Sequence, residues 1–251
     1  YLQSIVPEGV EPKVTIPSPS LIINRDQRSD GWADYYPTWQ AFLDDLAQAY
    51  HDTLQHFYDL GARYIQLDDT TWAYLIAQLN ANADDPAARA PFEQTAQDDV
   101  YVINQALAGL PDDLKLSTHI CRGNFKSTYL FEGGYEPVAK YLGQLNYDAF
   151  FLEYDNERSG DFGPLADIYN GRPNVEIVLG LFTSKSADLE AVDDVVARIN
   201  EAAQYVPKAQ LALSTQCGFS STEEGNILTI PDQWRKLALI KTIADQELAT
   251  V

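Results

Sequence analysis

The sequence predicts an α/β fold, a (β/α)8 TIM barrel that lacks its first two βα units in this chain. Six short apolar runs show little alternation, as in strands covered on both faces, and helical patterns lie between them. No Gly-rich phosphate turn of the GxGxxG or GxxxxGK type follows any run, which disfavours an open nucleotide-binding sheet. Polar side chains gather just past almost every run, where a barrel carries its functional groups.

The expected strands alternate with expected helices along the whole chain. The helical pattern at 37–60 is the strongest, because apolar residues recur every three or four positions between Pro37 in the first turn and Gly61 at the end. Weaker helical patterns cover about 94–109, 135–146, 187–204 and 232–247. The strands are expected at 13–17, 63–68, 114–119, 149–154, 176–182 and 210–215.

One barrel accounts for the chain as a single catalytic domain over 1–251. A closed barrel needs about eight strands and six are visible, so we expect the domain to be incomplete on its N-terminal side. The opening at Tyr1, without a methionine, agrees with that expectation. The stretch 78–98 is rich in Asn, Asp, Ala and Pro and is expected to be a surface insertion, partly helical, in a βα loop.

The charge balance excludes several classes of partner. Asp and Glu number 37 against 17 Lys and Arg, and the formal net charge of -20 repels nucleic acid and anionic membrane surfaces. No apolar run approaches the roughly 20 residues that a membrane span needs, and no basic, apolar leader opens the chain. We expect a soluble, cytoplasmic protein. The acidic residues Glu190, Asp193 and Asp194 are expected on a solvated helix face.

Four side chains at strand ends form a candidate metal site. His119 and Cys121 are two residues apart at the end of one expected strand, while Glu153 and Cys217 end two others. The ends of parallel strands meet at one edge of a barrel, and one His, one carboxylate and two thiolates suit tetrahedral Zn²⁺. The alternative is plain packing, with Cys121 and Cys217 as buried apolar residues and His119 as a structural histidine.

Several segments resemble the C-terminal catalytic barrel of cobalamin-independent methionine synthases, and still more closely their short single-barrel relatives, the methionine synthase-like methyltransferases. The resemblance spans about 12–245. The segments that carry it are 117–126 (STHICRGNFK), 150–155 (FFLEYD), 179–185 (LGLFTSK) and 213–219 (LSTQCGF), together with 65–70 (IQLDDT), which matches the family's IQxDEP strand.

The resemblance implies a catalytic zinc ion held by His119, Cys121, Glu153 and Cys217, and an aspartate, Asp68, that holds the amino group of homocysteine. The implied activity is transfer of a methyl group from a methyltetrahydrofolate-type donor to homocysteine, activated as a zinc thiolate, which gives methionine. Of the four ligands, Glu153 is expected to yield its place to the substrate sulfur, since it is an oxygen donor among softer ligands.

Two departures from the family pattern stand in the sequence. The histidine that serves as the family's proton donor has no counterpart at 183–185, which reads Thr-Ser-Lys, and the DEP motif reads Asp-Asp-Thr at 68–70. Arg122 and Lys185 could make the site locally positive toward a folate tail.

Three alternatives stay open at this point. A related zinc barrel could act on another thiol, in coenzyme M-type alkyl transfer or a lyase reaction. A zinc-free barrel of the decarboxylase type would use Asp68 as its principal group. A non-catalytic protein would hold zinc only structurally, in a closed site with no exchangeable ligand.

Overall fold

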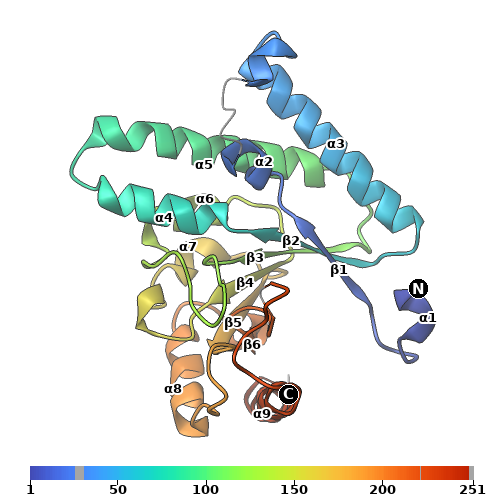
Figure 1. Cartoon of the computed structure of the whole chain (residues 1–251), viewed down its shortest axis with the longest axis vertical. Coiled ribbons are helices and arrows are strands. Elements are labelled where there is room, and N and C mark those ends of the chain that lie inside the picture. The colour runs from blue at the N-terminus through green and yellow to red at the C-terminus, as the bar shows by residue number, and fades with distance from the viewer. Residues whose placement is uncertain (26–30, 221, 249–251) are drawn as a thin grey trace.

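One parallel sheet organises the molecule in the computed structural model, which describes residues 1–25, 31–220 and 222–248. Its strands follow one another in sequence order, each hydrogen-bonded in parallel to the next, and they twist progressively across the molecule (Figure 1). The six strands are β1 (Lys13–Pro17), β2 (Tyr64–Asp69), β3 (Lys115–Ile120), β4 (Ala149–Glu153), β5 (Glu176–Phe182) and β6 (Leu211–Thr215). Sequential parallel order with intervening helices confirms the predicted α/β barrel-type fold class.

The two faces of the sheet differ in burial. In β2, Ile65 and Leu67 are buried among the helices, whereas the alternate residues Gln66 and Asp68 are only half-buried on the other face. That second face would be the interior of a closed barrel. Among the described residues β1 pairs only with β2 and β6 only with β5, so the barrel is open between β1 and β6. The expectation that two further βα units precede residue 1 stays a prediction.

The longest predicted helix is confirmed. Helix α3 (Trp39–Asp59) begins at Thr38, whose side chain accepts a hydrogen bond from the amide of Ala41, and it ends before Gly61, whose φ of +98° favours glycine. It packs against α5 (Pro86–Leu107) through a small cluster of buried residues: Leu43, Leu46, Ala47 and Val102.

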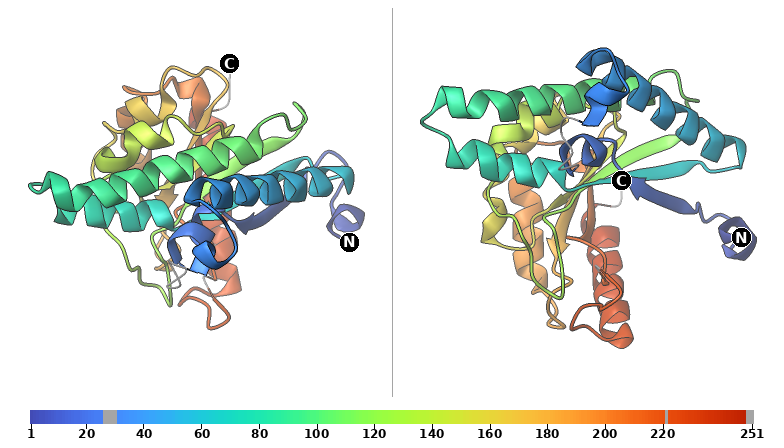
Figure 2. Two further views of the ribbon diagram at one scale, coloured as in Figure 1. Left: turned by 90° about the horizontal axis from the view of Figure 1, so that it is seen from above. Right: turned by 45° about the horizontal axis from the view of Figure 1, so that its top comes forward.

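The stretch 78–98 is a helical hairpin, which corrects the expectation of a loop insertion that is only partly helical. It holds the end of α4 (Thr71–Ala81), a turn at 82–85 and the first half of α5. Asp85 caps α5 by accepting hydrogen bonds from two backbone amides at 3.0 and 3.1 Å, and Pro86 occupies the first turn. The two helices lie side by side in both views of Figure 2. Pro91, one of the prolines of this stretch, is accommodated inside α5.

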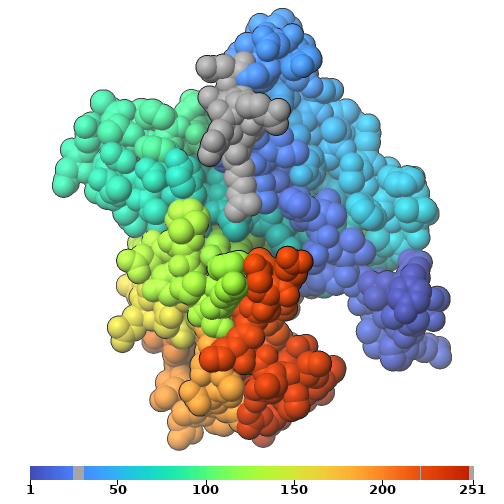
Figure 3. All heavy atoms as spheres, in the orientation of Figure 1, coloured from blue at the N-terminus to red at the C-terminus, as the bar shows by residue number. Residues whose placement is uncertain are grey.

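The remaining helices cover the rest of the sheet. Those expected at 135–146, 187–204 and 232–247 correspond to α6 (Glu136–Leu142), α8 (Val192–Ala202) and α9 (Ile230–Glu247). The sequence did not predict α1 (Leu2–Ile5), α2 (Ser20–Arg25), α4 or α7 (Leu165–Tyr169), nor three short 3-10 turns at Gly31–Asp34, Glu157–Ser159 and Lys208–Gln210. The α1 segment buries no side chain and lies at the margin of the molecule (Figure 3).

None of the helices in the described part of the chain is long and apolar enough to cross a membrane.

Candidate metal centre

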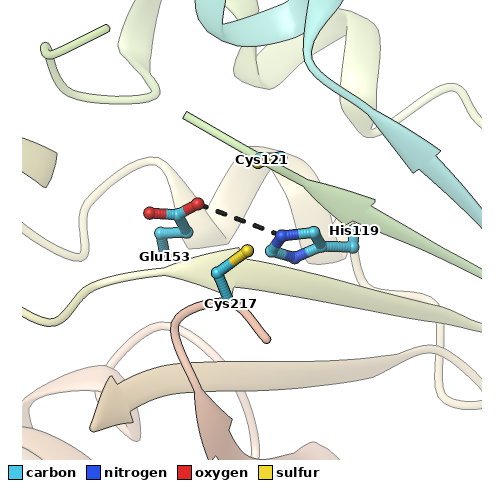
Figure 4. Close-up of side chains that lie close together, drawn as sticks. All are labelled: His119, Cys121, Glu153 and Cys217. Atoms are coloured by element: carbon cyan, nitrogen blue, oxygen red, sulfur yellow. Dashed lines mark ion pairs between the residues drawn. The ribbon is translucent and has the colours of Figure 1, made fainter. Parts of the chain in front are cut away.

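The four predicted ligand side chains converge at the carboxyl edge of the sheet. His119 lies in β3 and Cys121 directly follows that strand, while Glu153 ends β4 and Cys217 lies two residues beyond β6. One ligand atom from each of the four lies within 4.8 Å of the others. Figure 4 shows the side chains of His119, Glu153 and Cys217 turned toward a common point. The structure therefore brings together residues that are up to 98 positions apart in the sequence, from 119 to 217.

Backbone contacts at the strand ends fix this convergence. The amide of Cys121 donates to the carbonyl of Asp69 at 2.9 Å, which continues the β2–β3 pairing past β3. On the far side, the amide of Gln216 donates to the carbonyl of Phe182 at 2.9 Å, and the Thr215 hydroxyl donates to the carbonyl of Cys217 at 2.7 Å. Both cysteine-bearing turns are thus anchored to the sheet.

Close approach of backbones at Gly180 also shapes the site. Gly180 is opposite Glu153 in the β4–β5 register. A Cβ atom there would come within 2.7 Å of the Leu152 carbonyl oxygen and 2.8 Å of the Gln216 Cα atom. Only glycine therefore lets the turn that carries Cys217 lie so near Glu153.

The electrostatics of the cluster are those of strongly coupled neighbours. Burial lowers the pKa of His119, but the Cys121 sulfur and the nearby carboxylates outweigh burial and raise that pKa to about 9. A hydrogen bond from Cys217 holds the pKa of Cys121 well below its usual range, and that same contact, with burial, raises the pKa of Cys217. Burial raises the pKa of Glu153. The protonation of each group therefore depends on its neighbours, and the cluster titrates as a unit.

The donor set fits a zinc ion. The Nε2 atom of His119 is buried and has no hydrogen-bond partner, although the Glu153 carboxylate lies 3.9 Å away. Buried polar atoms normally have a hydrogen-bond partner, so a buried nitrogen without one, beside two thiols and a carboxylate, is consistent with a role as a metal ligand. Four donors of nitrogen, sulfur and oxygen type, within one small volume, match tetrahedral Zn²⁺ better than the oxygen-rich sites of Mg²⁺ or Ca²⁺.

Three donors surround the Glu153 carboxylate, and the sequence did not reveal them as a group. The backbone amide of Arg122 and the side-chain amide of Asn124 donate to Oε1 at 2.9 and 2.6 Å. The guanidinium of Arg158 donates to Oε2 at 2.6 Å. Asn124 is three residues after Cys121 and Arg158 five residues after Glu153, so proximity in the chain was the only available signal.

Asp68 lines the same cavity as the predicted ligands. The cavity holds about 340 Å³ and is bounded by Asp68, Asp69, His119, Cys121 and Cys217, with apolar walls from β1 and the start of α2. The side-chain amide of Gln66 donates to one oxygen of Asp68 at 2.7 Å. The role of Asp68 in substrate binding is taken up under the proposed function.

Asp69 is turned away from Asp68 and satisfied within the protein. It is buried and accepts hydrogen bonds from the Ser20 hydroxyl at 2.5 Å and the Thr71 amide at 2.7 Å. Asp69 therefore holds the loop after β1 to the start of α4.

The two cations that were expected to make the site positive are engaged elsewhere. Arg122 is fully buried, donates to the carbonyl of Gly133 at 2.7 Å and stacks over Tyr135. Lys185 forms an ion pair with Asp155 at 3.1 Å. Neither residue lines the 340 Å³ cavity.

The fold and the site define a βα protein of barrel type whose carboxyl edge carries four side chains that could hold a metal ion. Residues 36–231 match the protein family described as the catalytic domain of cobalamin-independent synthase. The chain belongs to the cobalamin-independent methionine synthase family.

Two similar proteins cover nearly the whole chain. YxjG, an uncharacterized protein of Bacillus subtilis, is 45% identical over 246 residues, which are 98% of this chain and 64% of YxjG. A solved structure from Listeria monocytogenes, provisionally named a vitamin-B12-independent methionine synthase, is 39% identical with a TM-score of 0.72 over 96% of this chain and 65% of that chain. The chain thus spans less than two thirds of the length of these relatives.

Two less similar relatives are named for two different enzyme activities. Methionine synthase of Pyrococcus horikoshii is 28% identical over 185 residues, covering 74% of this chain and 45% of that protein. The 2-hydroxypropyl-CoM lyase of Xanthobacter autotrophicus is 25% identical over 202 residues, covering 69% of this chain and 47% of that protein.

Proposed function

We propose that this chain is the zinc-binding part of a methyltransferase that transfers a methyl group to the thiol of homocysteine and so produces methionine. The observation that carries the proposal is the convergence of His119, Cys121, Glu153 and Cys217 within 4.8 Å at the carboxyl edge of the sheet. Family membership supports the same activity. The proposed methyl donor is of the methyltetrahydrofolate type, as the resemblance to the cobalamin-independent methionine synthases implies.

The four side chains have a common task in this proposal, which is to hold zinc beside the substrate cavity. Bound zinc would lower the pKa of a substrate thiol from about 8.5, so that the sulfur is a thiolate and a nucleophile at neutral pH. Cys121, Cys217 and Glu153 bring up to three negative charges, which over-neutralise a dication and leave electron density on the substrate sulfur. The zinc-free decarboxylase alternative leaves this donor set without a use.

The cavity favours an acceptor that carries an amino group. Its lining includes Asp68, whose side chain is on the same face of the sheet as His119, and no lysine or arginine is among the described residues that bound it. The oxygen of Asp68 that does not bind Gln66 can accept a charge-assisted hydrogen bond from an ammonium group, whereas a sulfonate would face like charge. Homocysteine therefore suits the cavity better than coenzyme M, the thiol that appears in the name of the lyase relative.

A cytoplasmic location is part of the proposal. Cys121 and Cys217 are free thiols whose sulfur atoms lie within 4.8 Å of each other. They must stay reduced to bind metal, and the cytoplasm is the compartment that keeps neighbouring thiols reduced.

The experiment is a thiol titration of the cobalt-substituted protein. Co²⁺ in a site with two sulfur ligands has visible absorption that changes when another sulfur binds. We expect homocysteine to alter the spectrum with saturation at one equivalent, and coenzyme M to do so only at much higher concentration. A spectrum that no thiol alters would show a closed structural site and would contradict the proposal. A preference for coenzyme M would favour the alkyl-transfer or lyase alternative.

A further inference from the structure

The Glu153 carboxylate is fully buried, yet both of its oxygens accept hydrogen bonds from other residues of the protein. Its Oε1 atom accepts hydrogen bonds from the Arg122 amide at 2.9 Å and from Asn124 at 2.6 Å. Its Oε2 atom accepts from Arg158 at 2.6 Å. The exposed fractions of the Glu153 and Arg158 side chains are 0% and 3%, so water contributes little to this arrangement.

Arg158 is itself fixed in place. It lies in the 3-10 turn Glu157–Ser159, where the Asn156 side chain accepts from its amide at 3.0 Å and its carbonyl accepts from Gly133 at 2.9 Å. The guanidinium stacks over Tyr129 at 4.2 Å. Both ends of the residue are therefore held, and the guanidinium cannot follow a moving carboxylate far.

Arg158 also belongs to a chain of alternating charges. It contacts Asp155 at 2.9 Å, and Asp155 in turn pairs with Lys185 at 3.1 Å. The sequence of contacts Glu153, Arg158, Asp155, Lys185 runs from the end of β4 to the loop after β5. Two anions and two cations balance, so the Glu153 charge is compensated by residues that are not metal ligands.

The other members of the cluster have no comparable set of partners. Among the described residues, the Nε2 atom of His119 has no hydrogen-bond partner. The donors to the Cys121 sulfur from outside the cluster are the neutral amide groups of Asn124, with the side chain at 3.5 Å. A histidine or thiolate displaced from zinc would therefore be left buried with little compensation, which is costly. Among the described residues of the cluster, Glu153 is the one with three donors, and one of them, Arg158, is a cation from outside the cluster.

We infer that Arg158 and Asn124 are positioning residues that hold the Glu153 carboxylate when a substrate thiol takes its place at the metal. The inference rests on the proposed function and names the residues that make Glu153 the exchangeable member of the four. Their hydrogen bonds also draw electron density from the carboxylate and make it a weaker metal ligand. Exchange then costs no uncompensated buried charge.

The experiment measures metal and thiol binding, without turnover, in the Arg158→Gln and Arg158→Lys variants. We expect Arg158→Gln to bind one Co²⁺ at least as tightly as the parent chain, because Glu153 becomes a stronger ligand without this hydrogen bond. The variant should need about tenfold more homocysteine for half of the spectral change, a loss of the order seen when a supporting contact of a metal ligand is removed. Arg158→Lys keeps the charge and should recover most of the lost affinity. Asn124→Ala, which removes the other side-chain donor, should shift the titration in the same direction.

A Glu153→Gln background separates positioning from general damage. The Arg158→Gln effect acts through the Glu153 charge, so it should disappear when that charge is absent. Arg198→Lys is the matched control, because Arg198 is a partly buried arginine that binds the Tyr154 carbonyl and stacks over Phe162 without contacting a carboxylate ligand. We expect it to leave the homocysteine titration unchanged.

Three results would overturn the inference, and they are distinguishable. If the parent chain responds to homocysteine and Arg158→Gln and Asn124→Ala respond at the same concentration, Glu153 does not depend on these residues and the inference alone is wrong. The same holds if the Arg158→Gln loss persists in the Glu153→Gln background. If the parent chain binds Co²⁺ and shows no thiol response, the proposed function is wrong and the inference with it.

Discussion

Asp68 and His119 are direct partners in the register of the parallel strands β2 and β3. Side chains at paired positions point to the same face, and neighbouring strands are about 4.8 Å apart. The proposed amino-group ligand and a proposed metal ligand therefore differ by one strand spacing. A small amino-acid thiol could reach both at once, which is the geometric basis for preferring homocysteine.

Replacement of Asp68 by asparagine should weaken the binding of amino-acid thiols. A charge-assisted hydrogen bond contributes roughly 1.5 to 3 kcal/mol, so Asp68→Asn should raise the homocysteine dissociation constant by about tenfold or more. The comparison thiol is 4-mercaptobutanoate, which lacks the amino group and should bind both proteins alike. Equal loss for the two thiols would mean that Asp68 acts only on the structure of the cavity.

Gly180→Ala should disrupt the metal site while the sheet remains folded. The added Cβ would lie within 2.8 Å of backbone atoms of Leu152 and Gln216, so the turn leading to Cys217 must move away from Glu153. We expect zinc affinity to fall by at least tenfold with little change in circular dichroism. Gly218→Ala is the control, since no atom lies within 4 Å of a Cβ built there. Undiminished zinc affinity in Gly180→Ala would show that the close approach is not required.

The buried ion pair between Lys236 and Glu190 should stabilise the loop after β5. Lys236 is fully buried, and its ammonium lies 2.9 Å from both oxygens of Glu190, which also accepts the Thr183 amide at 2.8 Å. Removing one partner leaves an uncompensated charge, so Glu190→Gln should lower the free energy of unfolding by about 3 kcal/mol.

Urea unfolding measures this effect. The double variant Glu190→Gln, Lys236→Met should recover much of the loss, because no buried charge remains. Breaking the exposed pair of Lys241 and Asp245 by Asp245→Asn should change stability by less than about 0.5 kcal/mol. A loss in Glu190→Gln no larger than this would disprove the role given to the buried pair.

The buried Asp99 should make stability fall as the pH rises. Burial, with the neighbouring carboxylates of Asp69 and Asp98, raises the pKa of Asp99 well above its usual range despite hydrogen bonds from Asn24. Above about pH 4 the unfolded chain has lost this proton while the folded chain retains it, so stability declines from there through the folded-state pKa.

The Asp99→Asn variant removes this titration. We expect it to be more stable than the parent chain at pH 8, with a smaller advantage at pH 5, in urea unfolding at the two pH values. The exposed Asp52 on α3 provides the control, since Asp52→Asn should leave the pH dependence unchanged. A parallel pH dependence in the parent chain and Asp99→Asn would contradict the account.

Strand positions and the convergence of the four candidate ligands could be predicted from the sequence because both depend on local pattern. The spacing of His119 and Cys121 at a strand end, and the position of Cys217 past another, need only the rule that parallel strands end at one edge. Arg158 could not be predicted, since it follows Glu153 in a 3-10 turn whose direction depends on tertiary contacts. Glu190 was wrongly expected on a solvated face, because nothing local shows that Lys236 is buried beside it.

The helical hairpin shows a different cause of error. Asp85 followed by Pro86 is a helix-start signal, yet Pro91 and the small polar residues around it were interpreted as loop. Pro91 lies early in α5, where the loss of one backbone donor is tolerated because the helix packs along α3 and α4. Packing outweighs local propensity at this position.

Zinc content and zinc X-ray absorption of the purified chain test the proposed metal site most directly. We predict one zinc per chain, with two sulfur ligands at about 2.3 Å and two nitrogen or oxygen ligands at about 2.0 to 2.2 Å. We also predict that Cys121→Ser and Cys217→Ser each remove one sulfur from that shell or lose the metal. A parent chain that binds no zinc when supplied with it under reducing conditions, or a bound zinc without two sulfur ligands, would contradict the central claim.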